Sequence, residues 1–174
     1  MINTVKNIHE VVITGNDLTL EQLVAVARYD AKITIDADAA ERIKASRAIV
    51  DKIVNSGAVV YGITTGFGSL CRVHISKEDC SQLQENLIRT HSCGFGKPFT
   101  RELTRAMMLI RINALVKGYS GIRPETLDTL IAMLNKGVHP YIPEKGSLGA
   151  SGDLAPLSHM VLPMLGLGDA EYQG

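Results

Sequence analysis

The spacing of hydrophobic residues predicts a chain built mainly of helices. From Asp36 or Asp38 to Ser56, apolar side chains recur at steps of three or four, and Gly57 then ends the pattern. These apolar positions are Ala39, Ile43, Val50 and Ile53. Because this spacing places them on one side of a helix, we expect a helix over the segment with that side turned to the core.

The same spacing predicts further helices along the chain. They are expected over about residues 76–91, 100–117 and 123–137 and directly after Asp153. In the helix over 100–117, one apolar stripe is expected to face the core, and the arginines of that helix lie mostly off it. The stripe consists of Leu103, Met107, Ile110 and Ala114, and the arginines are Arg101, Arg105 and Arg111.

The first part of the chain has a mixed pattern. Val11–Ile13 and Lys32–Ile35 are short runs rich in β-branched residues, which predict strands. Between them, Gln22 follows Thr19 by three positions, the spacing of a capping box at the start of a helix. We therefore expect a mainly α fold with a small mixed α/β start.

Composition and charge exclude several classes of partner. The chain has 174 residues, 45% of them hydrophobic, so it can bury a core as one domain or part of one. Lysine plus arginine and aspartate plus glutamate number 18 each and are interspersed, which predicts no binding of nucleic acid or of an anionic membrane. The start of the chain lacks a signal-peptide pattern, and no apolar run approaches the ~20 residues of a membrane helix. A cytoplasmic location is therefore expected.

The cysteines and most of the histidines lack the spacing of metal ligands, so no metal is expected. Cys71, Cys80 and Cys93 have no CxxC pairing and are expected to be buried or half-buried free thiols, with no disulfide framework. Four histidines also lack ligand spacing and are expected to be structural or at the surface. They are His9, His74, His139 and His159.

Three small residues, Ala150, Ser151 and Gly152, precede a predicted helix in the run GSLGASGDLAPL. Such residues allow a tight turn in which the Gly152 nitrogen attacks the Ala150 carbonyl carbon and closes a five-membered ring. Loss of water from the ring and of the Ser151 hydroxyl would leave a methylidene next to a carbonyl, an electrophile that no standard side chain provides. With Asp153 as N-cap and Pro156 in the first turn, this electrophile would face a helix N-terminus, which stabilises negative charge. Composition alone would equally suit a flexible loop before a capped helix.

The run resembles the signature of the histidine and aromatic amino acid ammonia-lyase family, in which an Ala-Ser-Gly triplet cyclises into a methylidene-imidazolone prosthetic group. Three upstream segments are similar to family segments and stand in the family's order: YGITTGFGS from Tyr61, QENLIRTHSCGFG from Gln84 and KGYSGIRP from Lys117. Together with HPYIPEKGSLGASGDLAPLSHM, they cover most of the chain from about residue 57 onward. The resemblance is closest to the histidine-specific members.

The resemblance implies roles for particular side chains. Tyr61 would be the base that removes the β-proton of the substrate, and it would need nearby positive charge or hydrogen-bond donors to act as a phenolate. Gly68, with the other glycines of its loop, would let that loop close around the substrate. His91 would face the substrate side chain, which favours histidine, then tyrosine, and phenylalanine least. Without the family context, Tyr61 would end a buried strand and His91 would be a structural or partly exposed residue.

The resemblance also implies an activity and an assembly. The enzyme would be a carbon–nitrogen lyase that eliminates ammonia from L-histidine to give urocanate. The chain would be the N-terminal segment of an elongated helical lyase fold, with residues 1–60 as a small mixed region and 61–174 as a helical region with active-site loops. Family members are longer and assemble as homotetramers, so this chain alone is expected to be inactive; whether the ring forms in it stays open.

Two alternatives remain at this stage. A tyrosine or phenylalanine ammonia-lyase, or an aminomutase, would use the same electrophile on another amino acid or return the ammonia to the β-carbon. A non-catalytic helical assembly module would instead use exposed apolar stripes to bind itself or a partner.

Overall fold

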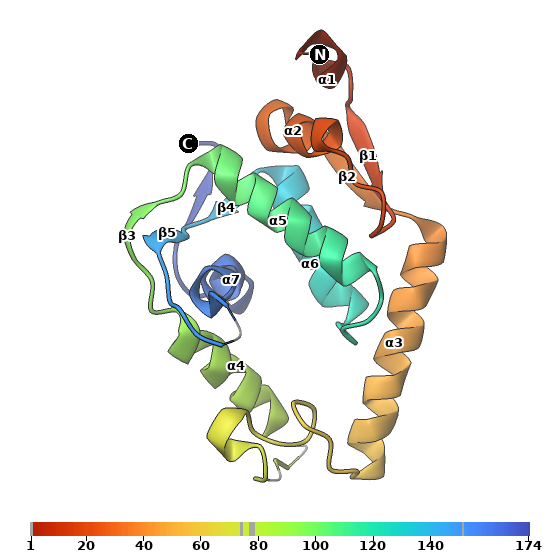
Figure 1. Ribbon diagram of the computed structural model, residues 1–174, viewed down its shortest axis with the longest axis vertical. Coiled ribbons are helices and arrows are strands. Elements are labelled where there is room, and N and C mark those ends of the chain that lie inside the picture. The colour runs from red at the N-terminus through yellow and green to blue at the C-terminus, as the bar shows by residue number, and fades with distance from the viewer. Residues whose placement is uncertain (1, 74, 77–78, 151) are drawn as a thin grey trace.

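The computed structural model describes residues 2–73, 75–76, 79–150 and 152–174, and these ranges are mainly helical (Figure 1). The helices are α1 (Ile2–Lys6), α2 (Leu20–Tyr29), α3 (Ala37–Ser56), α4 (Cys80–His91), α5 (Arg101–Val116), α6 (Pro124–Lys136) and α7 (Leu154–Val161), with short 3-10 helices at Gly68–Leu70 and Leu162–Leu165. The strands are β1 (Glu10–Ile13), β2 (Lys32–Ile35), β3 (Phe95–Pro98), β4 (Val138–Pro140), β5 (Pro143–Lys145) and β6 (Ala170–Tyr172).

The small mixed start of the chain forms as predicted. Strands β1 and β2 pair in parallel, and α2 connects them. The capping box at α2 is complete, because the Gln22 N–H donates to Thr19 Oγ1 at 3.3 Å and the Thr19 N–H donates to Gln22 Oε1 at 2.9 Å. Buried residues of this pair, among them Val11 and Ile33, belong to the same hydrophobic core as α5 and α6.

Helices α2, α5 and α6 form the centre of the core, and α3 leaves it along one side of the molecule (Figure 1). Helix α3 has the predicted N-cap and end, since Asp36 accepts a hydrogen bond from the Ala39 N–H and Gly57 is left-handed. Of its predicted core positions, Ala39 and Ile43 are buried, while Val50 and Ile53 are only half-buried. The second half of the helix therefore extends beyond the core.

The predicted inward stripe of α5 is wrong. Leu103 is 48% exposed and Ile110 is 54% exposed. The buried side of α5 is displaced by one to two residues around the helix and includes Met108, Ile112 and Arg105. Both stripes have the period of a helix, so periodicity alone could not choose between them. Packing against α2 and α6 makes the choice, and it buries an arginine that we expected off the apolar side.

Two antiparallel strand pairs join the C-terminal half, and neither was predicted. Strand β3 pairs with β5, and β4 pairs with β6. These strands are only three or four residues long and several contain proline, which hides them from a pattern of alternation. Helix α6 ends as predicted at the left-handed Gly137, and α4 packs against α7.

Helix α4 begins later than predicted. Its first residue is Cys80, although the Ser76 hydroxyl accepts a hydrogen bond from the Asp79 N–H at 3.1 Å and donates one to the Asp79 carboxylate at 2.7 Å. Ser76 thus pairs with Asp79 as the capping spacing suggested, but the pair lies before the helix.

The cysteines are free, but two of them are exposed. Cys71 and Cys93 lie at the surface and Cys80 is half-buried, which corrects the expectation of buried or half-buried thiols. Among the described residues, no three His, Cys, Asp or Glu side chains are close enough to hold a metal ion. His74 lies outside the described residues. No helix in the described ranges is long and apolar enough to span a membrane.

Candidate active site

The loop after α3 carries Tyr61 and is held by two buried threonines. The Thr64 hydroxyl, on a residue 3% exposed, donates to the Ala58 carbonyl at 2.6 Å and accepts from the Val60 N–H at 2.9 Å. The Thr65 hydroxyl, on a residue 1% exposed, accepts from the Gly62 N–H at 3.3 Å and donates to the Gly66 carbonyl at 2.9 Å. The two threonines of YGITTG therefore fix the backbone on both sides of Tyr61.

Tyr61 itself lies at the surface. Its side chain is among the exposed large hydrophobic groups of the chain, 62% accessible. Its ring makes an edge contact with Phe67 at a centroid distance of 6.2 Å. Within the described ranges, its hydroxyl makes no hydrogen bond. The interpretation of Tyr61 as the end of a buried strand is wrong, because it lies in an exposed turn.

At Gly68 the backbone of the loop turns sharply and is exposed. It begins a 3-10 turn at a φ of +57°, where a residue with a side chain would be strained. A Cβ placed on Gly68 would meet no atom within 4 Å. Its backbone is thus accessible from outside, as contact with a ligand would require.

His91 is the last residue of α4, and its ring is oriented by the helix. Its Nδ1 lies 2.8 Å from the carbonyl oxygen of Leu87, one turn earlier, and 3.2 Å from Thr90 Oγ1. Because a carbonyl can only accept, Nδ1 carries the proton in this arrangement. In the neutral imidazole, Nε2 is then the acceptor, and no hydrogen bond to it is recorded in the described part of the chain.

The backbone reverses between Gly149 and Gly152, on the segment that joins β5 to α7. The Gly152 N–H donates to the Gly149 carbonyl at 3.0 Å, and the Gly149 N–H donates back at 3.3 Å. Gly152 has a φ of +90°, and a Cβ there would meet no atom within 4 Å. Ala150 lies inside this reversal, and the predicted Ser151 lies outside the described residues. A pair of backbone hydrogen bonds therefore joins Gly149 and Gly152, on either side of Ala150.

The carboxylate of Asp153 holds the start of this segment. It accepts hydrogen bonds from the Ser147 N–H at 2.7 Å and from the Ser147 hydroxyl at 3.1 Å. A Cβ at Gly146 would overlap the same carboxylate. Asp153 occupies the N-cap position of α7 as predicted, but its side chain makes no capping hydrogen bond. The Asp153 carboxylate therefore binds the preceding loop and does not cap the helix.

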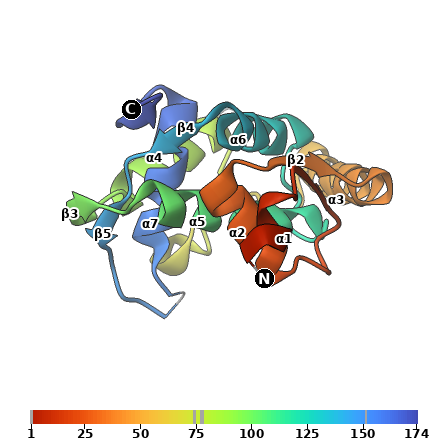
Figure 2. The ribbon, with the colours of Figure 1, turned by 90° about the horizontal axis from the view of Figure 1, so that it is seen from above.

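The predicted site residues lie on separate surface segments. The segment between β5 and α7 projects from the body of the molecule, while Tyr61 belongs to the loop that follows α3 (Figures 1 and 2). Within the described ranges, no hydrogen bond or ring contact joins Tyr61, Gly68 or His91 to residues 146–153.

Sequence reasoning missed a polar cluster at the centre of the fold. Arg105 is 2% exposed, and its guanidinium donates to the Val26 carbonyl at 2.8 Å and to the Leu134 carbonyl at 3.0 Å. These carbonyls lie in the last turns of α2 and α6, where backbone acceptors lack partners within the helix. His139 and Asp30 complete the cluster, at 3.3 Å and 3.4 Å from the guanidinium. An arginine among apolar residues at helical spacing was the available signal.

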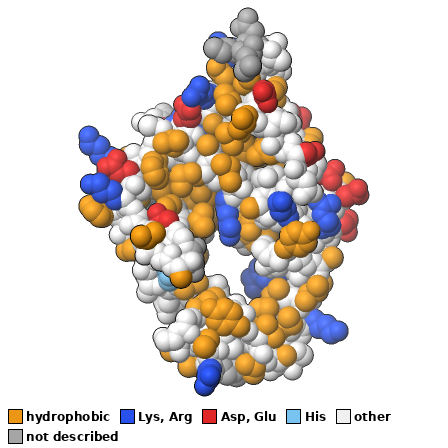
Figure 3. All heavy atoms as spheres, viewed as in Figure 1, with side chains coloured by type: hydrophobic (Ala, Val, Ile, Leu, Met, Phe, Trp, Pro, Cys, Tyr) orange, Lys and Arg blue, Asp and Glu red, His pale blue; other side chains and the backbone are white. Residues whose placement is uncertain are grey.

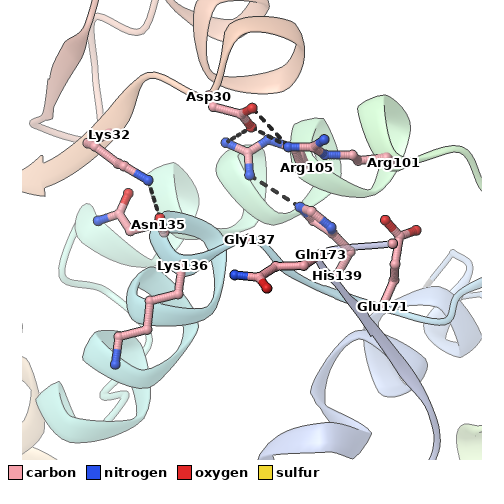
Figure 4. Close-up of a pocket in the computed structure, with 11 residues that line it drawn as sticks. Asp30, Lys32, Arg101, Arg105, Asn135, Lys136, Gly137, His139, Glu171 and Gln173 are labelled. Carbon is pink, nitrogen blue, oxygen red and sulfur yellow. Dashed lines mark hydrogen bonds and ion pairs between the residues drawn. The ribbon is translucent and has the colours of Figure 1, made fainter.

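This cluster borders a pocket of about 260 Å³ (Figure 4). Arg101 and Arg105 converge on the carboxylate of Asp30, and Glu171 and Gln173 of the last segment form another wall. Burial lowers the pKa of His139, and the charge of Arg105 lowers it further. The cluster contains none of the predicted site residues, and its hydrogen bonds connect helix ends.

Comparison with known proteins identifies the family of the chain. The model of the aromatic amino acid lyase family matches residues 18–174. The chain belongs to this family. Histidine ammonia-lyase from Clostridium tetani is 66% identical over 169 residues, which is 97% of this chain and 33% of that protein.

Two solved structures of family proteins show the same fold. Histidine ammonia-lyase from Trypanosoma cruzi is 45% identical with a TM-score of 0.86, over 94% of this chain and 31% of that one. A tyrosine aminomutase from Streptomyces globisporus is 38% identical with a TM-score of 0.88, over 95% of this chain and 31% of that one. The mainly α lyase fold predicted from sequence is confirmed. The chain spans about a third of the length of the curated relatives that it matches.

The family is the one whose members carry a methylidene-imidazolone. The described residues fit this group, because the backbone hydrogen bonds join Gly149 to Gly152 and a Cβ at Gly152 would meet no atom within 4 Å beyond its chain neighbours. Cyclisation would replace the hydrogen bond that the Gly152 nitrogen now donates with a covalent bond to the Ala150 carbonyl carbon.

Proposed function

We propose that the chain is the N-terminal segment of a histidine ammonia-lyase that converts L-histidine to urocanate and ammonia. The observation that carries this proposal is the 66% identity to the histidine ammonia-lyase of Clostridium tetani over nearly the whole chain. The tyrosine aminomutase shares the fold at only 38% identity. Substrate choice depends on few side chains, so the geometry of His91 has to agree with the proposal.

The orientation of His91 suits an imidazole substrate. Its Nδ1 is engaged by the Leu87 carbonyl, which leaves Nε2 to accept a hydrogen bond from a ligand. A neutral imidazole offers one N–H donor, and a phenol offers one O–H donor, whereas a phenyl ring offers none. The expected order of preference is therefore histidine, then tyrosine, then phenylalanine.

The prosthetic group and Tyr61 divide the chemistry in this proposal. Once formed from Ala150, Ser151 and Gly152, the ring supplies an electrophile that makes the substrate amine a better leaving group. The Tyr61 side chain, acting as a phenolate, takes the β-proton as general base and becomes the neutral phenol. The loop held by Thr64 and Thr65 presents that hydroxyl at the surface, and Gly68 leaves its backbone open to the substrate.

The site has to be completed from outside this chain. The described residues supply no hydrogen bond to the Tyr61 hydroxyl and no hydrogen bond or ring contact between Tyr61 and residues 146–153. We therefore propose that a protein of the relatives' length, called the full-length protein below, builds the site as a homotetramer in the cytoplasm. The 174-residue chain, with a small mixed region at 1–60 and a helical region at 61–174, is then inactive alone.

Urocanate formation by the full-length protein tests the proposal. We expect conversion of L-histidine well above that of L-tyrosine, no conversion of L-phenylalanine, and a loss of at least about a thousandfold in kcat for Ser151→Ala, which cannot form the methylidene. His91→Leu should lower kcat/KM for L-histidine about tenfold or more, because one hydrogen bond to the ring is lost. A β-amino acid product would indicate an aminomutase, and preferential release of ammonia from L-tyrosine would assign the other lyase activity.

The second candidate, a non-catalytic assembly module, has one observation in its favour. Large hydrophobic side chains are exposed on the loop that follows α3, in the lower part of the space-filling view (Figure 3). They include Val59, Tyr61, Leu70 and Val73. Light scattering that shows self-association of a full-length protein without any lyase or mutase activity would favour this candidate.

A further inference from the structure

His159 connects the two segments on which the proposed site depends. It lies in the last turn of α7, the helix that follows the triplet, and its Nε2 accepts a hydrogen bond from the Gly94 N–H at 3.1 Å. Gly94 is three residues beyond His91, at the end of α4. The contact bridges 65 positions of sequence. It therefore relates the end of the His91 helix directly to the helix that carries the triplet at its start.

The contact requires a neutral imidazole in one tautomer. A backbone N–H can only donate, so Nε2 must be unprotonated and Nδ1 must carry the hydrogen. Burial lowers the pKa of His159, which favours the neutral form at pH 7. An imidazolium would place an N–H against the Gly94 N–H and break the hydrogen bond.

Gly94 packs between the residue before the segment that carries the triplet, residues 146–153, and the helix after that segment. A Cβ on Gly94 would lie 3.1 Å from His159 Nε2 and 3.1 Å from the carbonyl oxygen of Lys145. Lys145 ends β5, directly before Gly146, and pairs with Phe95 of β3. The residue after Gly94 thus binds the strand that enters the triplet segment, and Gly94 itself binds the helix that leaves it.

We propose that His159 is a positioning residue that sets the distance between His91 and the triplet by holding Gly94 against α7. This inference rests on the proposed function, in which His91 and the prosthetic group formed from the triplet act on the same substrate. His159 does not contact the substrate in this arrangement. It acts through the backbone of residues 92–94, which ends the helix that orients His91.

Three variants of the full-length protein test this role. His159→Leu removes the acceptor, His159→Gln offers a side-chain oxygen near the position of Nε2, and His9→Leu is a matched control at an exposed histidine. We expect His159→Leu to raise KM for L-histidine about tenfold, with a smaller change in kcat and with the ring still formed, as read by intact mass. His159→Gln should restore KM to within about threefold, and His9→Leu should leave it unchanged.

Amide hydrogen exchange at Gly94 gives a readout that does not depend on activity. Exchange should become at least about fivefold faster in His159→Leu and return toward the wild-type rate in His159→Gln. Unchanged Gly94 exchange in His159→Leu would overturn the inference even if the enzyme is active, and so would an unchanged KM. A wild-type protein inactive on L-histidine, but with exchange that follows the acceptor, would refute the proposed function and leave the Gly94–His159 link standing.

Discussion

Arg105 Nη1 lies 3.3 Å from Nε2 of His139, inside the hydrophobic core. Since the guanidinium can only donate, Nε2 is the acceptor and Nδ1 carries the hydrogen in the neutral ring. Nδ1 is buried and has no recorded hydrogen-bond partner among the described residues. The pair therefore stabilises the ends of α2 and α6 through Arg105 while His139 retains an unsatisfied donor.

Replacement of Arg105 should destabilise the fold strongly. Arg105→Met retains much of the side-chain volume but removes the side-chain donor to the Val26 carbonyl and one of the two donors to the Leu134 carbonyl, so we expect a loss of about 2 to 4 kcal/mol in the free energy of unfolding. Arg28→Met, which removes an exposed ion pair with Glu102, should cost at most about 1 kcal/mol. Urea unfolding measures both, and equal effects of the two variants would contradict this account of Arg105.

Stability should fall on mild acidification because of His139 and His159. Burial lowers the pKa of both imidazoles in the folded chain below the ordinary value of 6.5. As the pH falls below that value, the unfolded chain therefore binds more protons than the folded chain, which favours unfolding. The histidine contribution to stability is complete above about pH 6.5 and is lost from there down to the folded-state pKa values.

His139→Gln separates the contribution of His139 to this loss. Its amide oxygen can still accept from Arg105, but the side chain does not titrate. We expect a shallower decrease of the free energy of unfolding between about pH 7 and pH 5 in this variant than in the wild type. Urea unfolding over that pH range is the measurement, and a wild-type chain that gains stability toward pH 5 would refute the prediction.

The Tyr61 loop should depend on the Thr65 hydroxyl. Thr65→Val preserves the shape of the side chain but leaves the Gly62 N–H and the Gly66 carbonyl without a partner, at a cost of about 1 to 2 kcal/mol. Hydrogen exchange over residues 61–66 should become faster, whereas Ser69→Ala at an exposed position should have no effect. Exchange that is unchanged in Thr65→Val would show that other contacts hold the loop.

Gly146 should be required for the geometry of the triplet segment. A methyl group in Gly146→Ala would overlap the Asp153 carboxylate and displace it from the Ser147 N–H and hydroxyl. We expect this variant of the full-length protein to form less of the ring, as measured by the mass of the peptide that contains the triplet. Leu148→Ala, at a side chain 98% exposed in the same segment, is the control and should form the ring normally. Equal ring formation in both variants would mean that the Asp153 contacts do not shape the turn.

Local signals in the sequence predicted much of the fold. Thr19 with Gln22, Asp36 with Gly57, and Gly137 fix helix ends through contacts within a few residues, so they could be recognised without tertiary structure. The buried side of α5 could not be, because two apolar stripes compete and only packing against α2 and α6 selects one. The β3–β5 and β4–β6 pairs depend on partners at least 30 residues apart, which no local pattern encodes.

The candidate site was recognisable only in part, for a similar reason. The triplet and the glycine-rich loop are contiguous motifs, so both could be recognised from sequence, and the structure adds the backbone bridge between Gly149 and Gly152. The roles of His159 and Arg105 depend on contacts 65 and 79 residues away, to Gly94 and Val26. The position of Arg105 among apolar residues could have indicated that it is buried, but neither it nor a histidine in a short apolar helix identifies a partner so far along the chain.

The mass of the peptide that contains Ala150, Ser151 and Gly152, taken from the full-length protein, tests the central claim most directly. If the chain makes its own electrophile, this peptide is lighter than its sequence by two water molecules, one from ring closure and one from the Ser151 hydroxyl. A full-length protein that releases ammonia from L-histidine while this peptide keeps its unmodified mass would contradict the account.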